Sequence, residues 1–245
     1  MSERYYAGRQ ALAEGQSITL SAEETQHLVK VMRKQPGAQV RLFSSGQDAL
    51  GVFRNTENKC AVIQIEQVSA GIAGPDVSLH MLIPWIKGGK TEFVIQKLTE
   101  LGVASIAIFS SRREVVKPSE SKLERLQKVA IEACKQCERA EVPELSEYRD
   151  LKSALGSFMV TTQQRLLLYE RERTVHFSDV IKVALAGADR RELVIASGPE
   201  GGFDPEEIEA VSAICMRVGF GPRILRAETA PIAAAAAALA LSGNV

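Results

Sequence analysis

Long apolar runs, a cysteine framework and a net charge are what this 245-residue chain lacks. No apolar segment reaches the roughly 20 residues that cross a bilayer, and the first residues do not form a signal-peptide pattern. We therefore expect no membrane partner and a cytoplasmic location. Its four cysteines, without a secretory context, argue against a disulfide framework. The formal net charge of zero means that the whole molecule does not attract nucleic acid.

Two of the cysteines form a Cys-x-x-Cys pair, Cys134 and Cys137. A zinc or redox site is one interpretation, but a structural zinc site needs a second matching pair, and the sequence has none. The pair also lies inside a helical pattern, Leu123 to Arg139. We interpret the cysteines as two small residues on one helix face, three positions apart, and expect no metal.

Positive charge is concentrated in the region from Ile86 to Lys128, which holds nine Lys or Arg residues and five Glu. Such a run is typical of a solvated helix face. It is also the electrostatic pattern of a phosphate-binding surface. Charge alone leaves both interpretations open.

The first seventy or so residues predict a small β domain with one helix. The expected strands are short and separated by turn residues: Ser17–Leu20, Gln39–Ser44, Ala49–Asn55 and Cys60–Val68. A helix capped by Ser21, with Glu24 three residues later, is expected to stop at Pro36. Several short strands with one helix suggest a small barrel. The small-residue segment Ser69–Asp76 is the best linker, so we divide the chain into residues 1–72 and 73–245.

After the linker, apolar strand patterns alternate with helical patterns. The expected strands are Val77–Ile83, Ala104–Phe109, Arg165–Tyr169, Leu193–Ala196 and Met216–Phe220. Strands separated by helices predict a parallel sheet, and hence an α/β domain.

A glycine-rich loop follows the expected strand Leu193–Ala196. Asp204, Pro205 and Glu207 then form a helix start, with an acidic N-cap, a proline at N1 and a capping-box glutamate. Strand, loop and helix place residues 198–202 at the carboxyl edge of the sheet, where open α/β sheets bind ligands. The loop lacks the lysine of a Walker loop and the spacing of a dinucleotide fingerprint. It therefore suits a neutral or cationic ligand held by backbone groups, although a plain tight turn remains the alternative.

The last part of the chain runs from a glycine-proline turn into a helix made almost entirely of alanine and leucine. A helix that is apolar all round is buried. Either a neighbouring subunit or the protein's own core could cover it.

Five motifs in one order resemble the RsmE family of 16S ribosomal RNA uridine-N3 methyltransferases, in the SPOUT superfamily. They are HLVKVMR (27–33), EFVIQKLTELGV (92–103), ACKQCERAEVPE (133–144), GPEGGFDPEE (198–207) and FGPRILRAETA (220–230). Together they cover nearly the whole chain. The resemblance implies an N-terminal PUA-like β-barrel domain that binds RNA. It further implies a C-terminal SPOUT domain with a deep trefoil knot, an exception to the rule that chains do not thread themselves.

The resemblance also implies a homodimer and the cofactor S-adenosylmethionine (SAM). SAM carries a sulfonium and no phosphate, which agrees with a loop free of lysine. The residues that would contact it are Leu168, Gly198, Pro199, Glu200, Gly201, Gly221, Ile224, Leu225, Arg226 and Thr229.

The chemistry assigns a role to Arg226. Methyl transfer from a sulfonium is an in-line displacement, so the enzyme chiefly aligns the reacting atoms. Uridine N3 must lose a proton, and a cation beside the base stabilises the developing charge. The alternative for Arg226 is an ion pair with Glu228 or Glu200 that only shapes the fold. N3 lies on the Watson–Crick edge, so the target uridine must be unpaired. The general base stays unassigned.

The RNA partner would be 16S rRNA or the small ribosomal subunit. Contacts to it are expected from Arg33, Lys87, Lys90, Lys97, Arg112, Arg113, Gln136 and Arg139. One departure from the family pattern is Lys135, where a glutamate is common, and it makes an ion pair built at that position doubtful.

Two other functions fit the sequence less well. One is an RNA-binding protein of the same fold whose pocket no longer turns over. The other is a nucleotide-dependent small-molecule enzyme, which the missing phosphate fingerprint disfavours.

Overall fold

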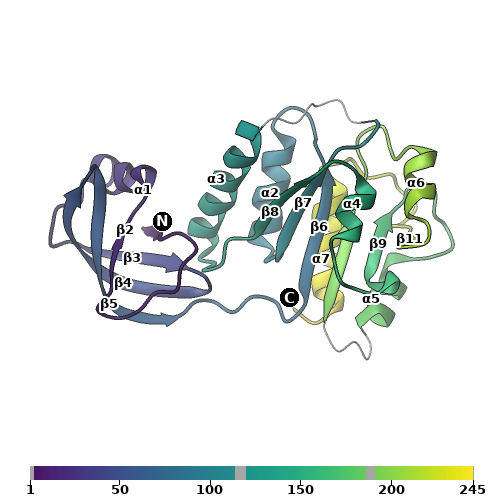
Figure 1. Ribbon diagram of the computed structural model, residues 1–245. Helices are drawn as coiled ribbons and strands as arrows, with labels where there is room; N and C mark the ends of the chain where they lie inside the picture. Colours follow the sequence, from purple (N-terminus) through teal and green to yellow (C-terminus); the bar gives the residue numbers. More distant parts are fainter. Residues whose placement is uncertain (1–2, 114–119, 186–190, 245) are drawn as a thin grey trace. The chain divides into compact units, whose positions relative to one another are not determined.

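The computed structural model describes residues 3–113, 120–185 and 191–244. Contacts divide the chain into two compact units (Figure 1). One holds residues 1–74 and 131–142, and the other holds 75–130 and 143–245. Among the described residues, every helix is too short or too polar to cross a membrane.

The N-terminal unit is built on a mixed five-stranded sheet in the order β1-β3-β4-β5-β2. Its strands are β1 (Arg4–Tyr6), β2 (Ser17–Thr19), β3 (Gln39–Ser44), β4 (Gln47–Glu57) and β5 (Cys60–Ala70). β1 runs parallel to β3, and the other neighbours are antiparallel. The expected strands are confirmed. β1 was missed because its residues, Arg-Tyr-Tyr, do not alternate apolar with polar.

The helix expected after Ser21 is shorter than predicted. Ser21 is its N-cap, since its Oγ accepts a hydrogen bond from the Glu24 backbone N–H at 3.2 Å. α1 (Ala22–Gln26) passes into a π-helical turn, η1 (His27–Val31), which ends at Met32. Arg33 has φ +54°. This left-handed conformation ends the helix before the predicted stop at Pro36.

Residues 131–142 belong to the N-terminal unit although they lie far along the chain. Arg4 is buried and forms an ion pair with Asp48. Its Nη1 also donates to the carbonyl oxygens of Cys134 and Arg139, each at 3.4 Å. These contacts explain why the segment joins the unit. The division of the chain at residue 72 stays a prediction, and the contacts add 131–142 to the first unit.

Lys135 forms an ion pair, although the sequence made an ion pair at this position doubtful. Its Nζ lies 2.6 Å from Glu24 Oε1 and 2.6 Å from Glu132 Oε1. The side chains of Lys135 and Glu24 are 10% and 8% exposed. Burial by itself lowers the pKa of Lys135, but the hydrogen bonds to Glu132 and Glu24 outweigh it and raise that pKa. The charge reversal is therefore compensated inside this chain.

The C-terminal unit is built on a six-stranded, all-parallel sheet in the order β11-β9-β10-β6-β7-β8. Its strands are β6 (Ser78–Pro84), β7 (Ser105–Phe109), β8 (Glu144–Tyr148), β9 (Arg165–Leu168), β10 (Glu192–Ala196) and β11 (Met216–Val218). The sequence predicted all of these strands except β8. That strand lies at the edge of the sheet and is only partly buried, so it lacks the apolar run that marked the others.

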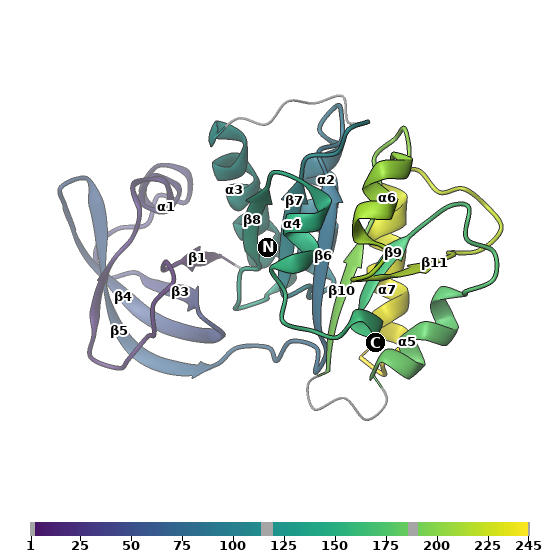
Figure 2. The same ribbon diagram turned by 45° about the vertical axis from the view of Figure 1, so that its right-hand side comes forward.

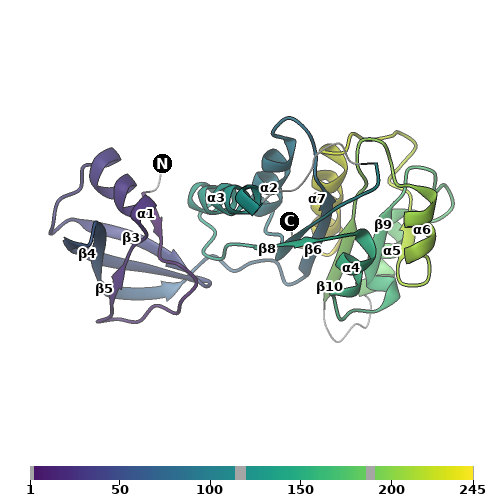
Figure 3. The ribbon, with the colours of Figure 1, turned by 45° about the horizontal axis from the view of Figure 1, so that its top comes forward.

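Helices cover both faces of this sheet. They are α2 (Lys90–Glu100), α4 (Leu151–Gly156), α5 (Phe177–Leu185), α6 (Pro205–Val211) and α7 (Thr229–Leu241), with a 3₁₀ turn, η2 (Thr162–Gln164). A further helix, α3 (Glu120–Cys137), begins in this unit, and its residues from 131 on belong to the N-terminal unit. α4 and α6 lie in front of the sheet and α7 behind it (Figure 2). α2 and α7 share one face (Figure 3).

The alanine-rich helix α7 is partly buried within its own unit. It packs against α2, α5, β6 and β10. Its buried residues are Pro231, Ala234, Ala235, Ala238 and Leu239, while Leu241 at its end is exposed. The protein's own core therefore supplies one side of the predicted burial. The homodimer and the trefoil knot stay predictions.

Candidate active site

A cavity of about 490 Å³ lies at the carboxyl ends of β9, β10 and β11. Three adjacent parallel strands bring their following loops together there, as expected of an open α/β sheet. The lining residues are Lys90, Leu168, Tyr169, Glu170, Gly198, Pro199, Glu200, Gly201, Gly202, Phe220, Gly221, Arg223, Ile224, Leu225, Arg226, Ala227, Glu228 and Ala230. The volume is within the usual range for a cofactor-sized ligand, roughly 300–1,000 Å³.

The structure brings together every residue expected to contact the cofactor except Thr229. Thr229 instead begins α7, and its backbone N–H donates to the Arg226 carbonyl oxygen at 2.9 Å. The sequence missed Tyr169 and Glu170, which directly follow Leu168. The rule that parallel strands end at one edge could have identified them, because residues just beyond Leu168 must lie at that edge.

The glycine loop, residues 198–202, is fixed at its far end by the predicted capping box. Asp204 accepts from the Glu206 backbone N–H at 3.1 Å, and the Asp204 N–H donates to Glu207 Oε2 at 2.9 Å. A side chain at Gly198 would crowd the Phe203 ring, since a Cβ there would lie 3.0 Å from it. Gly202 has φ +70°. These constraints explain the tight turn and leave its backbone facing the cavity.

The charged side chains of the cavity partly neutralise one another. Lys90 Nζ lies 3.0 Å from Glu228 Oε1. The pKa of Glu228 is lowered, first by its own backbone N–H and then by Lys90. Within the described part of the chain, Arg226 forms no ion pair, and its side chain is exposed. The ion pair of Arg226 with Glu228 or Glu200 that the sequence left open is therefore absent among the described residues, although the charge of Arg226 contributes to the lowered pKa of Glu228.

Comparison with known proteins gives the cavity its context. A family model described as an RNA methyltransferase domain matches residues 74–239. The ribosomal RNA small subunit methyltransferase E of Bacillus subtilis is 31% identical over 248 residues, covering 96% of this chain and 95% of that protein. The chain belongs to the RsmE family. The enzyme of the same description from Synechocystis is also 31% identical, over 90% of this chain and 72% of that protein.

Two solved relatives share the whole fold. A protein from Legionella pneumophila, solved in complex with the cofactor SAM, is 28% identical with a TM-score of 0.83 and 98% of both chains covered. A ribosomal RNA small subunit methyltransferase E from Neisseria gonorrhoeae, bound to SAM, is 27% identical with a TM-score of 0.78 and the same coverage. RsmE-type architecture and its reaction class, SAM-dependent methyl transfer to RNA, therefore hold for this chain.

The residues that we expect to contact RNA differ in their exposure and in their ion pairing. Arg33 and Lys87 are exposed, as is the uncharged Gln136. Lys97 forms an ion pair with Glu100 at 2.7 Å. Burial lowers the pKa of Arg139, which is partly covered. Their role in RNA binding stays a prediction.

Two further cationic side chains of the basic region, Lys117 and Lys122, lie outside the described residues and side chains.

The Cys-x-x-Cys pair contributes no reactive thiolate through Cys134, because burial raises the pKa of that thiol to about 12.

The loop 172–175 supports the part of the RsmE cavity wall that follows β11. The Gly219 N–H donates to the Val175 carbonyl oxygen at 2.8 Å, and Arg173 Nη1 donates to the Gly221 carbonyl oxygen at 3.3 Å. Glu172 holds the loop in shape by accepting from the Thr174 N–H at 2.8 Å and the Thr174 hydroxyl at 2.5 Å. The wall that carries Arg226 thus depends on this loop.

Replacing Gly219 by alanine is expected to destabilise the protein by about 1–3 kcal/mol, the usual cost of overpacking. The new Cβ would lie 2.4 Å from the Glu172 carbonyl oxygen, a backbone atom that cannot rotate away. Urea denaturation measures the change. Gly243→Ala is not a suitable control because Gly243 has φ +80°, whereas Gly156→Ala is, since its Cβ would meet nothing within 4 Å. Equal losses in the two variants would contradict the steric account.

A pH-dependent effect is expected at Glu172. Hydrogen bonds from the Thr174 side chain, then from the Thr174 and Val175 N–H groups, lower its pKa from 4.5 to about 2. A depressed carboxylate pKa contributes stability above the unfolded pKa, and the contribution is lost as pH falls toward 2. We expect Glu172→Gln to be less stable than the wild type at pH 7 and equally stable near pH 2. Thermal unfolding of both proteins across this pH range measures the effect. A difference in Tm between Glu172→Gln and wild type that did not change with pH would contradict the role given to Glu172.

Proposed function

We propose that this chain uses SAM to methylate N3 of a uridine in 16S rRNA. The observation that carries the proposal is the cavity itself, formed by two glycine-bearing loops that come together at the ends of three parallel strands. Membership of the RsmE family supports the substrate class, and the SAM complexes of the Legionella and Neisseria relatives support the cofactor.

The cavity suits SAM in charge as well as in volume. Its lining includes three carboxylates, Glu170, Glu200 and Glu228, besides Lys90, Arg223 and Arg226. Since Lys90 is paired with Glu228, no surplus of positive charge is available for a phosphate. A sulfonium against backbone carbonyls and carboxylates suits this lining better than a dinucleotide does. SAM would supply the methyl group, and the chain's own residues would hold the two reactants in line.

Arg226 is the residue that we propose for the chemical step. Its guanidinium is exposed in the cavity and forms no ion pair in the described part of the chain. It can therefore turn toward a uracil oxygen and stabilise the negative charge that develops as N3 loses its proton. A guanidinium suits this role because it stays protonated at any physiological pH.

The target uridine would reach the cavity only when it is unpaired and turned out of its helix. The cations Arg33, Lys87 and Lys97, together with Gln136 and Arg139, are proposed to hold the surrounding RNA through its phosphates. We further propose that the enzyme is a cytoplasmic homodimer.

Methyl transfer to small ribosomal subunits tests the proposal. Subunits from cells that lack this protein are incubated with the purified wild-type chain and SAM carrying a labelled methyl group, and the digested RNA is analysed by mass spectrometry. We expect labelled 3-methyluridine at one position. A label on another atom or another base would contradict the proposed reaction. Calorimetry that shows no SAM binding would favour the alternative of an RNA-binding protein without turnover.

A further inference from the structure

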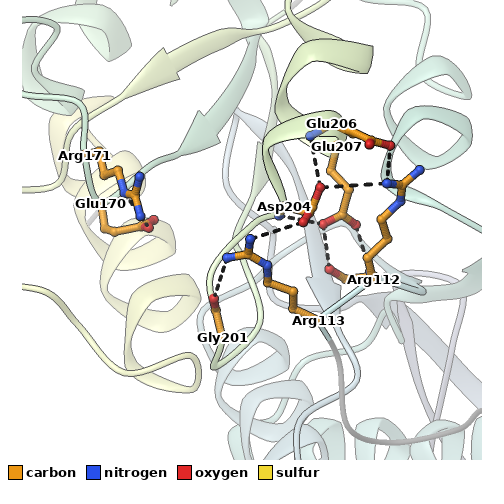
Figure 4. Close-up of polar contacts among 9 residues, drawn as sticks. Arg112, Arg113, Glu170, Arg171, Gly201, Asp204, Glu206 and Glu207 are labelled. Carbon is orange, nitrogen blue, oxygen red and sulfur yellow. Dashed lines mark hydrogen bonds and ion pairs between the residues drawn. The ribbon is translucent and has the colours of Figure 1, made fainter.

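The Arg113 side chain reaches the glycine loop of the cavity (Figure 4). Its Nη1 donates to the Gly201 carbonyl oxygen at 3.4 Å, and its Nη2 donates to Asp204 Oδ2 at 3.1 Å. A Cβ at Gly201 would lie 3.2 Å from the Arg113 Cβ. Gly201 does not have a positive φ, so the need for space, rather than backbone freedom, accounts for the glycine here. Gly201 is also one of the residues that line the cavity.

The segment that carries Arg113 is itself fixed to the start of α6. Glu207 accepts from the Ser111 hydroxyl at 3.1 Å and from the Arg112 backbone N–H at 3.1 Å. The same carboxylate accepts the Asp204 N–H of the capping box at 2.9 Å. One carboxylate therefore holds both the residues that follow β7, Ser111 and Arg112, and Asp204, which lies just beyond the glycine loop. Because its backbone is anchored in this way, Arg113 reaches the loop from a fixed point.

The charges in this cluster are already balanced by partners. Arg112 forms ion pairs with Glu206 and Asp204, and Arg113 forms one with Asp204. Hydrogen bonding by the Glu206 N–H, and then by Arg113, lowers the pKa of Asp204. A phosphate would have to displace these carboxylates. The geometry is that of a brace for the loop rather than of a vacant phosphate site.

We propose that Arg113 is a positioning residue for the cofactor: it holds the Gly198–Gly202 loop in the conformation that binds SAM. This inference rests on the proposed function. It differs from the sequence prediction for Arg113, which assigned it to RNA, in one measurable respect. A brace affects SAM affinity when no RNA is present, whereas a phosphate contact does not.

Calorimetric titration of the full chain with SAM, without RNA, tests the proposal. We expect Arg113→Ala to raise the Kd about tenfold, roughly the effect of losing one charge-assisted hydrogen bond. Arg113→Lys keeps the charge opposite Asp204 but loses the two-pronged contact, so its Kd should lie between those of wild type and Arg113→Ala. In turnover assays, the KM for SAM should rise while kcat at saturating SAM stays within about twofold of wild type.

Two further variants separate bracing from general damage. Arg149→Ala removes an exposed arginine that pairs with its neighbour Asp150 at 3.2 Å, and its Kd should stay within about twofold of wild type. Asp204→Asn keeps a competent N-cap but loses the charge, so its effect should be non-additive with that of Arg113→Ala. A wild-type Kd in a folded Arg113→Ala protein would overturn this inference alone. A wild-type protein that does not bind SAM would overturn the proposed function and this inference with it.

Discussion

Arg226→Ala is expected to lower the rate of methyl transfer by about 10²–10³-fold, the usual cost of removing one preorganised donor to a developing charge. The Kd for SAM should change little. The reason is the position of Arg226, whose side chain is exposed in the cavity and unpaired within the described part of the chain, while its carbonyl oxygen accepts from Thr229 and Ala230. Alanine keeps those backbone bonds and removes only the cation. Single-turnover kinetics at saturating SAM measures the effect.

A matched control for Arg226→Ala exists on β11, the strand that precedes Arg226 in the chain. Arg217 is an exposed arginine of β11 that does not line the cavity. We expect Arg217→Ala to transfer the methyl group at nearly the wild-type rate. Turnover by Arg226→Ala that equals that of Arg217→Ala would remove Arg226 from the chemistry. A large rise in the SAM Kd of Arg226→Ala would instead make it a binding residue.

Lys135→Ala is expected to cost about 3–5 kcal/mol of unfolding free energy, because it breaks a buried pair and leaves an uncompensated charge. Lys135 and Glu24 are 10% and 8% exposed, and 2.6 Å separates Lys135 Nζ from Glu24 Oε1. Removing the lysine would leave the Glu24 carboxylate buried with Glu132 still near it. Chemical denaturation measures the loss.

Two comparisons make this result specific. Lys97→Ala breaks a more exposed pair, with Glu100, and should cost less than about 1 kcal/mol. The double variant Lys135→Met with Glu24→Gln removes both charges and should recover much of the lost stability, because no ion is left unpaired. Equal losses in Lys135→Ala and Lys97→Ala would show that the buried pair does not stabilise the fold.

Local signals in the sequence predicted the parts of the site that depend on neighbouring residues. The cap at Asp204 and Glu207, the glycine turn and the strand before it all follow from spacing within a few positions. The parallel sheet then places the loops after β9, β10 and β11 side by side. For this reason the sequence alone predicts that the cofactor residues lie in one cavity.

The remaining features depend on contacts between distant parts of the chain, which no local pattern records. Arg113 meets Gly201 across 88 positions, and Arg4 meets Cys134 across 130. The pairing of Lys135 with Glu24, which answers the doubt raised by the sequence, is of the same kind. The sequence marked Arg112 and Arg113 as cations, but only the folded structure shows the carboxylates opposite them.

The most direct test of the account is a mass map of methylated uridines in 16S rRNA from cells with and without this protein. We predict that one 3-methyluridine disappears when the protein is absent and returns when the wild-type chain is supplied, but not when Arg226→Ala is supplied. An unchanged set of methylated uridines in cells lacking the protein would contradict the proposed function.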